Sequence, residues 1–386
     1  MRFNIFISIV IYSIPVLLCV LAYKYKNKHF IFAFLILAFL ITAFRFNIAT
    51  DFGRYYNRAF YRTELGISFN EPIEMFFFYI SSKAGLPRLF FMLNAAIVSI
   101  CGYILYLQYK DLKRHELMFI AYYFIILVGN YITRYCAAVA VSSVGVYFLI
   151  NYSKNKKYFM YYLLIALLSF CFHTGAILTL AFPLILYIYD KIKRDNGIFK
   201  YTYTIIMGTI GACLPLAVVV GDLLISSFSI FDKFSLYFMC FKECIPKNIF
   251  MITLMLAVIC AVGFLFDILS VTFNKNKYIK VFSIGSMMFM FFVIIALFRG
   301  QYLLDVMRIG VIFVFQSFIL FLFVFSDKKI NKSFSSKISI YIISSIYICL
   351  LIFCVILGSY NNFPYNTDTT VPWDSGSTYV QKMTNY

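Results

Sequence analysis

The stretch TDFGRYYNRAFYR, residues 50–62, places charged and aromatic side chains directly after a hydrophobic run that ends at Arg45. Its charged residues are Asp51, Arg54, Arg58 and Arg62, and Tyr55 and Tyr56 stand among them. The planar guanidinium of arginine donates paired hydrogen bonds to phosphate or carboxylate groups. The pattern therefore indicates either an anion-binding site or a set of anchors at a membrane boundary.

Two acids and a histidine elsewhere in the chain have side chains that could take part in proton transfer. Glu71 and Glu74 stand at the expected start of a short helix, where the helix dipole favours a carboxylate in any case. His173, in CFHTGA, lies at a short turn between two hydrophobic runs. A histidine at such a place is more often a packed or capping residue than a catalytic one, so both interpretations stand.

Three further arginines lie at the ends of hydrophobic runs. Arg134 opens one run in NYITRYCAAVA, as an anchor or as a functional group. Arg299 and Arg308 lie in FRGQYLLDVMRIG between two other runs. Asp305 precedes Arg308 by three positions, so these two could simply pair on one helix face.

The composition indicates a protein whose exterior faces lipid. Of the 386 residues, 63% are hydrophobic and only 13% are charged, whereas soluble proteins carry about 25% charged residues. The apolar runs approach the roughly 20 residues that a membrane-spanning helix needs, and they lack the alternation of barrel strands. We therefore predict an all-α polytopic membrane protein with about 12 transmembrane helices. The spans are expected near 3–23, 30–46, 88–109, 115–132, 135–151, 157–172, 174–190, 200–222, 248–271, 278–298, 307–326 and 337–358.

The loops between these spans alternate in charge, as the positive-inside rule requires. Lysine clusters such as YKYKNKH, YSKNKKY and NKNKYIK all fall on one side, which we assign to the cytoplasm. Both termini then lie on the outer side of the membrane. The net charge of +18 reflects this topology and contact with membrane lipids, so no nucleic-acid partner is expected.

Arginine does not follow lysine in this distribution. Most arginines lie on the outer side: Arg2, Arg45, Arg54, Arg58, Arg62, Arg88, Arg134, Arg299 and Arg308. Topology alone does not require such a split, because lysine and arginine mark the inner side equally well. Some of these arginines reach outer headgroups, but the outward excess favours an anionic ligand on that face.

We treat 1–386 as a single integral membrane domain with three substantial outer segments. The loop 46–87 contains a short interfacial or re-entrant helix near 72–83, because its apolar part is too short to span. The loop 223–247 is aromatic, and the tail 359–386 carries the lone tryptophan, Trp373.

Several classes of chemistry lack their motif. No phosphate-cradling Walker sequence is present, so ATP does not supply the energy. Three widely separated histidines argue against a zinc site, and we expect no metal and no cofactor. Asp222 and Asp267 fall near span ends, so few acids lie deep enough for a proton-coupled transporter.

In order along the chain, these residues resemble the EpsG/Wzy-type bacterial polysaccharide (O-antigen) polymerases. The resemblance covers nearly the whole chain but departs from the family pattern after Pro72 and after Arg134, where Ile-Glu and Tyr135 stand. The matching elements are Arg45, Thr50-Asp51-Phe52-Gly53-Arg54-Tyr55, Glu71-Pro72, Arg134, Phe172-His173-Thr174-Gly175, Arg308, Val371-Pro372-Trp373, and the Arg-x10-Gly spacings Arg134 to Gly145 and Arg299 to Gly310.

The resemblance implies a GT-C-like bundle in the bacterial cytoplasmic (inner) membrane, with its outer face toward the periplasm. It also implies an outward-facing glycosyltransferase that needs neither nucleotide nor metal. Such an enzyme transfers a glycan from undecaprenyl pyrophosphate to a lipid-linked repeat unit, and it works with a chain-length regulator protein. The pyrophosphate-binding candidates are Arg45, Arg54, Arg58, Tyr55, Arg134, Arg299 and Arg308. A lipid-linked oligosaccharide flippase and an O-antigen ligase-type transferase remain as alternatives.

Three outer groups are candidates for the base that takes the proton of the acceptor hydroxyl. The helix dipole weakens Glu71 as a base and favours a capping role. Neighbouring arginines keep Asp51 ionised but weakly basic. His173 titrates near neutrality, so we favour it as base or hydroxyl positioner, with Asp51 second.

Overall fold

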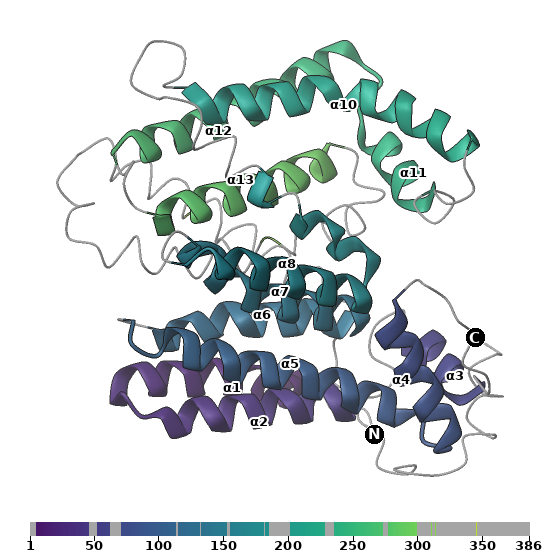
Figure 1. Ribbon diagram of the computed structural model, residues 1–386, viewed down its shortest axis with the longest axis vertical. Helices are drawn as coiled ribbons and strands as arrows, with labels where there is room; N and C mark the ends of the chain where they lie inside the picture. Colours follow the sequence, from purple (N-terminus) through teal and green to yellow (C-terminus); the bar gives the residue numbers. More distant parts are fainter. Residues whose placement is uncertain are drawn as a thin grey trace. The chain divides into compact units, whose positions relative to one another are not determined.

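A computed structural model describes most of the first 300 residues as helices joined by short turns (Figure 1). The described residues are 5–45, 52–61, 71–112, 115–131, 133–152, 155–180, 182–184, 201–227, 235–272 and 277–298, with Gly310, Phe313 and Ser345. Every regular element within these ranges is a helix, which confirms the all-α prediction. The residues group into two compact units, one within 1–181 and one within 182–350.

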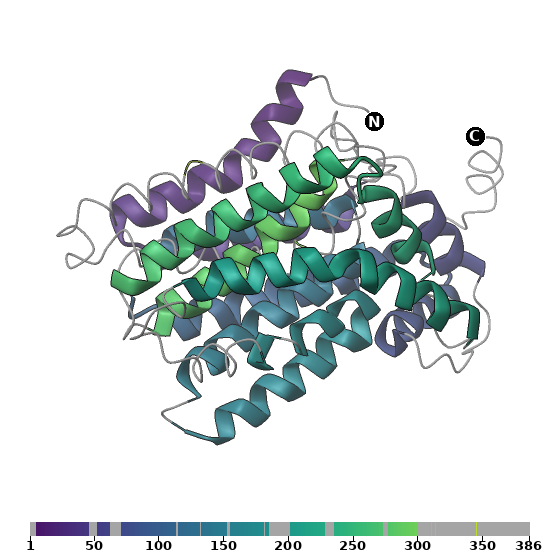
Figure 2. The ribbon, with the colours of Figure 1, turned by 90° about the horizontal axis from the view of Figure 1, so that it is seen from above.

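The first unit is a bundle of apolar helices. Its long helices are α1 (Ile5–Tyr25), α2 (Lys28–Phe44), α5 (Arg88–Tyr109), α6 (Met118–Tyr131), α7 (Thr133–Asn151) and α8 (Lys157–Phe172), with 3₁₀ helices η1 (His115–Leu117) and η2 (Thr174–Leu180). Local chemistry sets their ends: the Asn27 side chain accepts from His29 N–H at 3.0 Å and so caps α2. Pro15 lies inside α1, and Figure 2 shows that helix bent along its length.

Helix α7 forms the centre of this unit and packs against α5, α6 and α8. Small residues allow the neighbouring helices to approach closely, and Ala137, Ala138 and Ala140 are fully buried. The Ser169 hydroxyl on α8 donates to the Ala138 carbonyl at 2.6 Å. The start of α7, which carries Arg134, is therefore held on several sides.

Two short helices, α3 (Phe52–Tyr61) and α4 (Pro72–Lys83), lie at one end of the unit (Figure 1). The helix expected near 72–83 is confirmed with these bounds, and Pro72 occupies its first turn, where the missing N–H is not needed. Aromatic residues fasten both helices to the start of α5: the rings of Phe78 and Phe90 stack at 4.1 Å, and those of Phe52 and Phe91 at 4.7 Å.

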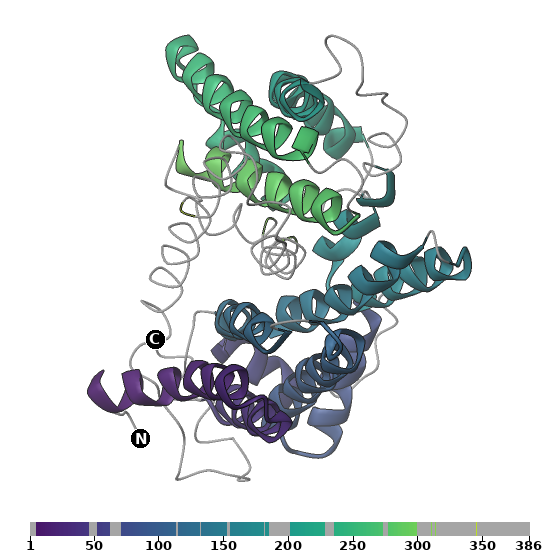
Figure 3. The same ribbon diagram turned by 90° about the vertical axis from the view of Figure 1, so that its left-hand side faces the viewer.

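The second unit contains α10 (Thr202–Ser227), α11 (Ser235–Cys244), α12 (Ile249–Thr272) and α13 (Lys277–Leu297), shown in Figure 3. Helices α10 and α12 pack closely because Gly263 has no side chain. A Cβ at Gly263 would lie 2.8 Å from the Thr204 Cα, closer than real Cβ atoms approach. The α10–α12 pair therefore depends on this glycine.

Four described helices are long and apolar enough to cross a membrane, by length and composition: Arg88–Tyr109, Thr133–Asn151, Thr202–Leu224 and Ile249–Ile268. Most other predicted spans coincide with helices, including 3–23 with α1 and 278–298 with α13. The span predicted at 174–190 differs, since it begins as the 3₁₀ helix η2. The spans predicted at 307–326 and 337–358 and the tail 359–386 lie outside the described residues, apart from Gly310, Phe313 and Ser345.

Candidate functional site

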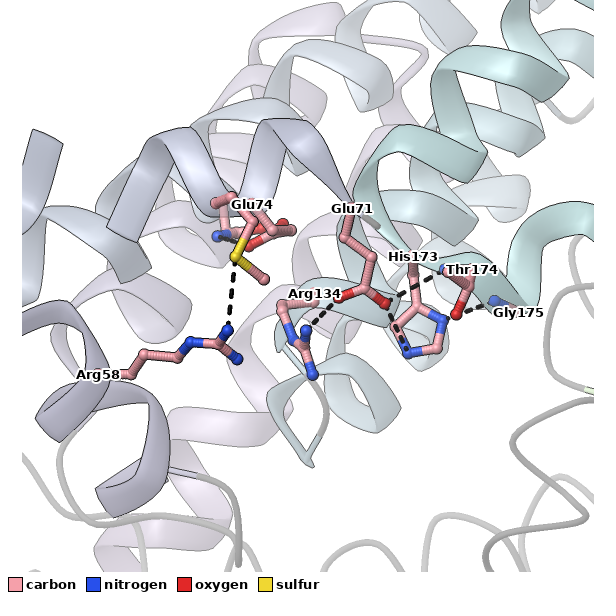
Figure 4. Close-up of polar contacts among 9 residues, drawn as sticks. Arg58, Glu71, Glu74, Arg134, His173, Thr174 and Gly175 are labelled. Carbon is pink, nitrogen blue, oxygen red and sulfur yellow. Dashed lines mark hydrogen bonds and ion pairs between the residues drawn. The ribbon is translucent and has the colours of Figure 1, made fainter. Parts of the chain in front are cut away.

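The site is centred on the carboxylate of Glu71, at the start of α4. Its Oε2 accepts a hydrogen bond from Arg134 Nη1, and its Oε1 accepts one from Thr174 N–H at 3.2 Å. The Nε2 atom of His173 lies 3.8 Å from the same Oε1 (Figure 4). Groups from three separate elements thus converge on one carboxyl group at one end of the first unit.

The expected capping role of Glu71 does not match the structure. Glu71 occupies the N-cap position of α4, but its side chain makes no capping hydrogen bond. Its backbone adopts the left-handed conformation, with φ 55° and ψ 55°, which is unusual for a residue with a Cβ. This backbone geometry directs the carboxylate away from α4 and toward α7 and η2 (Figure 4).

Arg134, in the first turn of α7, is the cation of the site. Its guanidinium bonds Glu71 and lies 5.0 Å from the centre of the Tyr55 ring. Tyr55 is only 3% exposed and packs against Phe78 and Phe90, so in this conformation its ring contacts protein groups. Tyr55 therefore positions Arg134, a contact that the sequence alone did not indicate.

His173 ends α8, and its ring is held on two sides. Its Nδ1 accepts from Gly175 N–H at 3.0 Å, and its ring meets Tyr135 edge-on at 5.0 Å. A side chain on Gly175 would crowd this contact, because its Cβ would lie 3.0 Å from Nδ1. Since Nδ1 accepts a hydrogen bond, the neutral ring carries its proton on Nε2, the atom that faces Glu71. In this arrangement His173 is a donor toward Glu71.

Arg45 positions the residue that precedes Arg134. It is 1% exposed, donates from Nη2 to the Thr133 hydroxyl and lies 5.5 Å from the centre of the Phe91 ring. Thr133 directly precedes Arg134, so Arg45 fixes the start of α7. Arg88 acts similarly on α2, because its Nη1 donates to the Phe44 carbonyl at 3.2 Å.

Glu74, one helical turn after Glu71, is fully buried beside this cluster. Its Oε2 accepts from Asn94 Nδ2 at 3.3 Å, and its Oε1 has no hydrogen-bond partner in the described part of the chain. Burial raises the pKa of Glu74 to about 8, and Glu71 adds to this effect, while Arg134 and Asn94 oppose it. Glu74 therefore keeps its proton at neutral pH.

The remaining candidates lie apart from Glu71 or outside the described residues. Arg58 Nη2 lies 3.5 Å from Met75 Sδ, and its guanidinium lies 5.1 Å from the centre of the Phe78 ring (Figure 4). Arg54 belongs to α3. The residues Asp51, Arg299 and Arg308 lie outside the described part of the chain. Of the candidates, the structure brings together Glu71, Arg134, His173 and Tyr55.

Glu74 was named with Glu71 at the helix start but was not among the three candidates for the base, although its position carries a further signal. Glu74 shares a helical stripe with Met75, Phe78 and Ser81, all of them buried. A carboxyl group on an otherwise buried face is a rare and informative position. The sequence contains this pattern, but it does not show that Asn94 on α5 is the hydrogen-bond partner of Glu74.

Comparison with known proteins places the chain in a family. The model of the EpsG family matches residues 27–367, which include every described residue of the site. No curated protein and no solved structure matches the chain. The family match and the apolar helices indicate a multi-pass, polysaccharide polymerase-like membrane protein. Because the match extends over most of its length, the chain belongs to the EpsG family.

Proposed function

We propose that the protein is an outward-facing glycosyltransferase that polymerises undecaprenyl-pyrophosphate-linked oligosaccharide repeat units into O-antigen or a related surface polysaccharide. The observation that carries this proposal is the convergence of Arg134, His173 and the Thr174 N–H at one end of the helices. This end is the one that the lysine distribution assigns to the outer side.

The proposed reaction needs an anion site and a proton acceptor. The acceptor hydroxyl oxygen forms a bond to the anomeric carbon of the donor, and the bond from that carbon to the phosphate oxygen breaks. The pyrophosphate leaves with the bonding electrons, and a base takes the hydroxyl proton. The energy comes from the bond between the sugar and the pyrophosphate, which breaks in this step, in agreement with the absence of a nucleotide motif in the sequence.

The residues of the site fit these two requirements. Arg134 stabilises the charge that grows on the leaving pyrophosphate, because a fixed guanidinium needs little reorganisation. Arg45 and Arg88 position the elements around it. Arg54, Arg299 and Arg308, which the sequence analysis assigns to the outer side, remain candidates for further phosphate contacts, whereas Arg58 contacts Met75 and the Phe78 ring.

Proton acceptance falls to Glu71 or Asp51 in this proposal. The favoured role of His173 as base weakens, because its Nδ1 lone pair already accepts from Gly175 N–H. His173 is better suited to donate from Nε2 and to hold an oxygen atom in place. The Glu71 carboxylate lies 3.8 Å from Nε2, the atom that carries that proton.

Deletion of the gene tests the proposal against its two alternatives. A polymerase mutant should lose long surface polymer and keep the single-repeat product, because one repeat unit can still be transferred to the surface carrier without polymerisation. A flippase mutant or a ligase mutant should show no surface polymer of any length. Complementation with the wild-type chain should restore long polymer, and Arg134→Ala should not. Retention of long polymer in the deletion strain would contradict the proposal.

A further inference from the structure

We propose that Glu71 occupies the place of a substrate phosphate in the resting protein, and that donor pyrophosphate displaces it to release the catalytic base. The identity of the displacing anion rests on the proposed function above. In this scheme Arg134 and Thr174 N–H hold the Glu71 carboxylate until the pyrophosphate of the glycan substrate binds. The pyrophosphate then accepts the hydrogen bonds of the same two groups. Once displaced, the Glu71 carboxylate reaches the acceptor hydroxyl and takes its proton.

The donors around Glu71 are those that would bind a phosphate group. A guanidinium, a backbone N–H and an imidazole N–H approach the two carboxylate oxygens from different elements (Figure 4). Each donor can turn to a phosphate oxygen without a change of protonation. The Arg134 side chain keeps 17% of its surface exposed, against 9% for Glu71, so the guanidinium is the more accessible partner. Its Nε also has no hydrogen-bond partner in the described part of the chain.

The backbone of Glu71 permits this displacement. Helix α4 does not use the carboxylate as a cap, and Pro72 begins the helix with its φ already fixed. The left-handed conformation of Glu71 is unfavourable for a residue with a Cβ, so it persists because the contacts of the side chain hold it. Loss of those contacts to a phosphate lets Glu71 move while α4 stays folded.

The exchange couples donor binding to the activation of the base. In the resting arrangement both Glu71 carboxylate oxygens already accept hydrogen bonds, Oε2 from Arg134 and Oε1 from Thr174 N–H, so neither is placed to meet an acceptor hydroxyl. Once pyrophosphate neutralises Arg134, the displaced carboxylate takes the hydroxyl proton as the glycosidic bond forms and the pyrophosphate leaves with its electron pair. Burial raises the pKa of the neighbouring Glu74 to about 8, which favours its protonated form, a weaker partner for Arg134 than a carboxylate.

The test measures binding of inorganic pyrophosphate to the purified full-length protein by calorimetry. The variant Glu71→Gln keeps the shape of the side chain and removes its charge. No carboxylate at position 71 then competes with pyrophosphate for Arg134. We expect pyrophosphate affinity to rise about tenfold, the effect of one displaced ion pair, and polymerisation of a lipid-linked repeat unit to be lost. Unchanged or weaker pyrophosphate binding by the folded variant would overturn the proposal.

Glu116 provides a matched control. It is also a buried carboxylate with a cation and a histidine beside it, since Lys26 Nζ lies at 3.1 Å and His115 Nδ1 at 3.9 Å. It lies between α5 and α6, on the side assigned to the cytoplasm. Glu116→Gln removes the same charge and should leave pyrophosphate affinity unchanged. An equal rise in both variants would mean a general effect of charge, and would contradict a specific site at Glu71.

Glu71→Asp covers the case in which Glu71→Gln does not fold. It keeps the charge but shortens the reach to Arg134, so pyrophosphate should bind more tightly than to wild type, though less than to Glu71→Gln. No tightening in folded Glu71→Asp would overturn the exchange. The two proposals fail separately. If the Glu71 variants bind pyrophosphate more tightly but the deletion strain keeps long polymer, only the polymerase function is rejected. If their binding is unchanged but the deletion strain loses long polymer, only the exchange at Glu71 is rejected.

Discussion

Glu71 in the first unit and Asp267 in the second are both buried carboxylates that accept backbone N–H groups. Asp267 Oδ1 accepts from Tyr203 N–H at 2.8 Å, and its Oδ2 accepts from Thr204 N–H at 2.8 Å and from the Thr204 hydroxyl at 2.7 Å. These are neutral donors at the start of one helix, α10. Glu71 instead meets a guanidinium, an imidazole and a backbone N–H from separate elements, the last two at 3.8 and 3.2 Å.

The difference separates a structural carboxylate from a functional candidate. Donors that belong to one helix start satisfy that helix, so Asp267 acts as a cap supplied by α12. Donors that converge from several elements create a charged centre that no single helix needs. The comparison also bears on the transporter alternative, because Asp267 is committed to α10 and is poorly suited to carry protons.

The largest effect is expected at Arg134. Arg134→Ala should lower the rate of polymerisation at least a hundredfold, because hydrogen bonds to a charged group contribute roughly 1.5–3 kcal/mol each. Arg134→Lys should recover little, since lysine lacks the planar fork. Rates measured with purified protein and a lipid-linked repeat unit provide the check.

Arg58 supplies the control for that prediction. It contacts Met75 and the Phe78 ring, so Arg58→Lys should keep most of the activity. Equal loss in Arg58→Lys and Arg134→Lys would mean that the Glu71 cluster is not the anion site.

Asp267 should show the opposite balance between stability and rate. Asp267→Asn should lower the free energy of unfolding by about 1–2 kcal/mol, because a charged cap is replaced by a weaker one. The rate per folded molecule should stay within about twofold of wild type. Thermal unfolding in detergent, combined with the rate corrected for the folded fraction, measures both. A rate loss as large as that of Glu71→Gln would remove the distinction between the two carboxylates.

His173 tests whether the imidazole is a base or a donor. We expect His173→Gln to lower the rate about ten- to a hundredfold, because the variant loses an oriented donor. The acid limb of the pH–rate profile should remain, since it reports the titration of another group. Disappearance of that limb in His173→Gln would restore His173 as the base.

Sequence patterns predicted the helices better than the site. The helix at 72–83 follows from Pro72 and the apolar run after it. Helix α3 was missed, although its buried residues Phe52, Tyr55, Tyr56 and Ala59 follow helical spacing. The same stretch carries arginines, so the sequence analysis interpreted it by its charge and not by its periodicity.

The arrangement around Glu71 could not be predicted, because it depends on tertiary packing. Glu71 and His173 are far apart in the chain, and they meet only because α4 packs against the end of α8. The sequence indicated both residues as candidates through their types and positions. It did not indicate that Gly175 fixes the histidine tautomer or that Glu71 fails to cap α4, since both depend on local backbone angles.

At Glu74 the expected effect is a change in how stability depends on pH. The pKa of Glu74 is about 8 in the folded protein, against 4.5 for an ordinary glutamate, chiefly because the group is buried. Between these values the folded state holds a proton that the unfolded state lacks. The contribution of Glu74 to stability is therefore fully present below pH 4.5 and is lost as the pH rises toward 8.

Glu74→Gln should remove this contribution to the pH dependence, because glutamine resembles the protonated acid and does not titrate. The apparent melting temperature of the variant relative to wild type should rise between pH 5 and pH 8, measured in one detergent at one heating rate. Glu71 and Glu74 differ in their partners: Arg134 and Thr174 N–H bind the Glu71 carboxylate, while Glu74 has an oxygen without a hydrogen-bond partner in the described part of the chain. An equal difference between Glu74→Gln and wild type at both pH values would mean that Glu74 is ionised throughout, and that Arg134 is shared between two carboxylates.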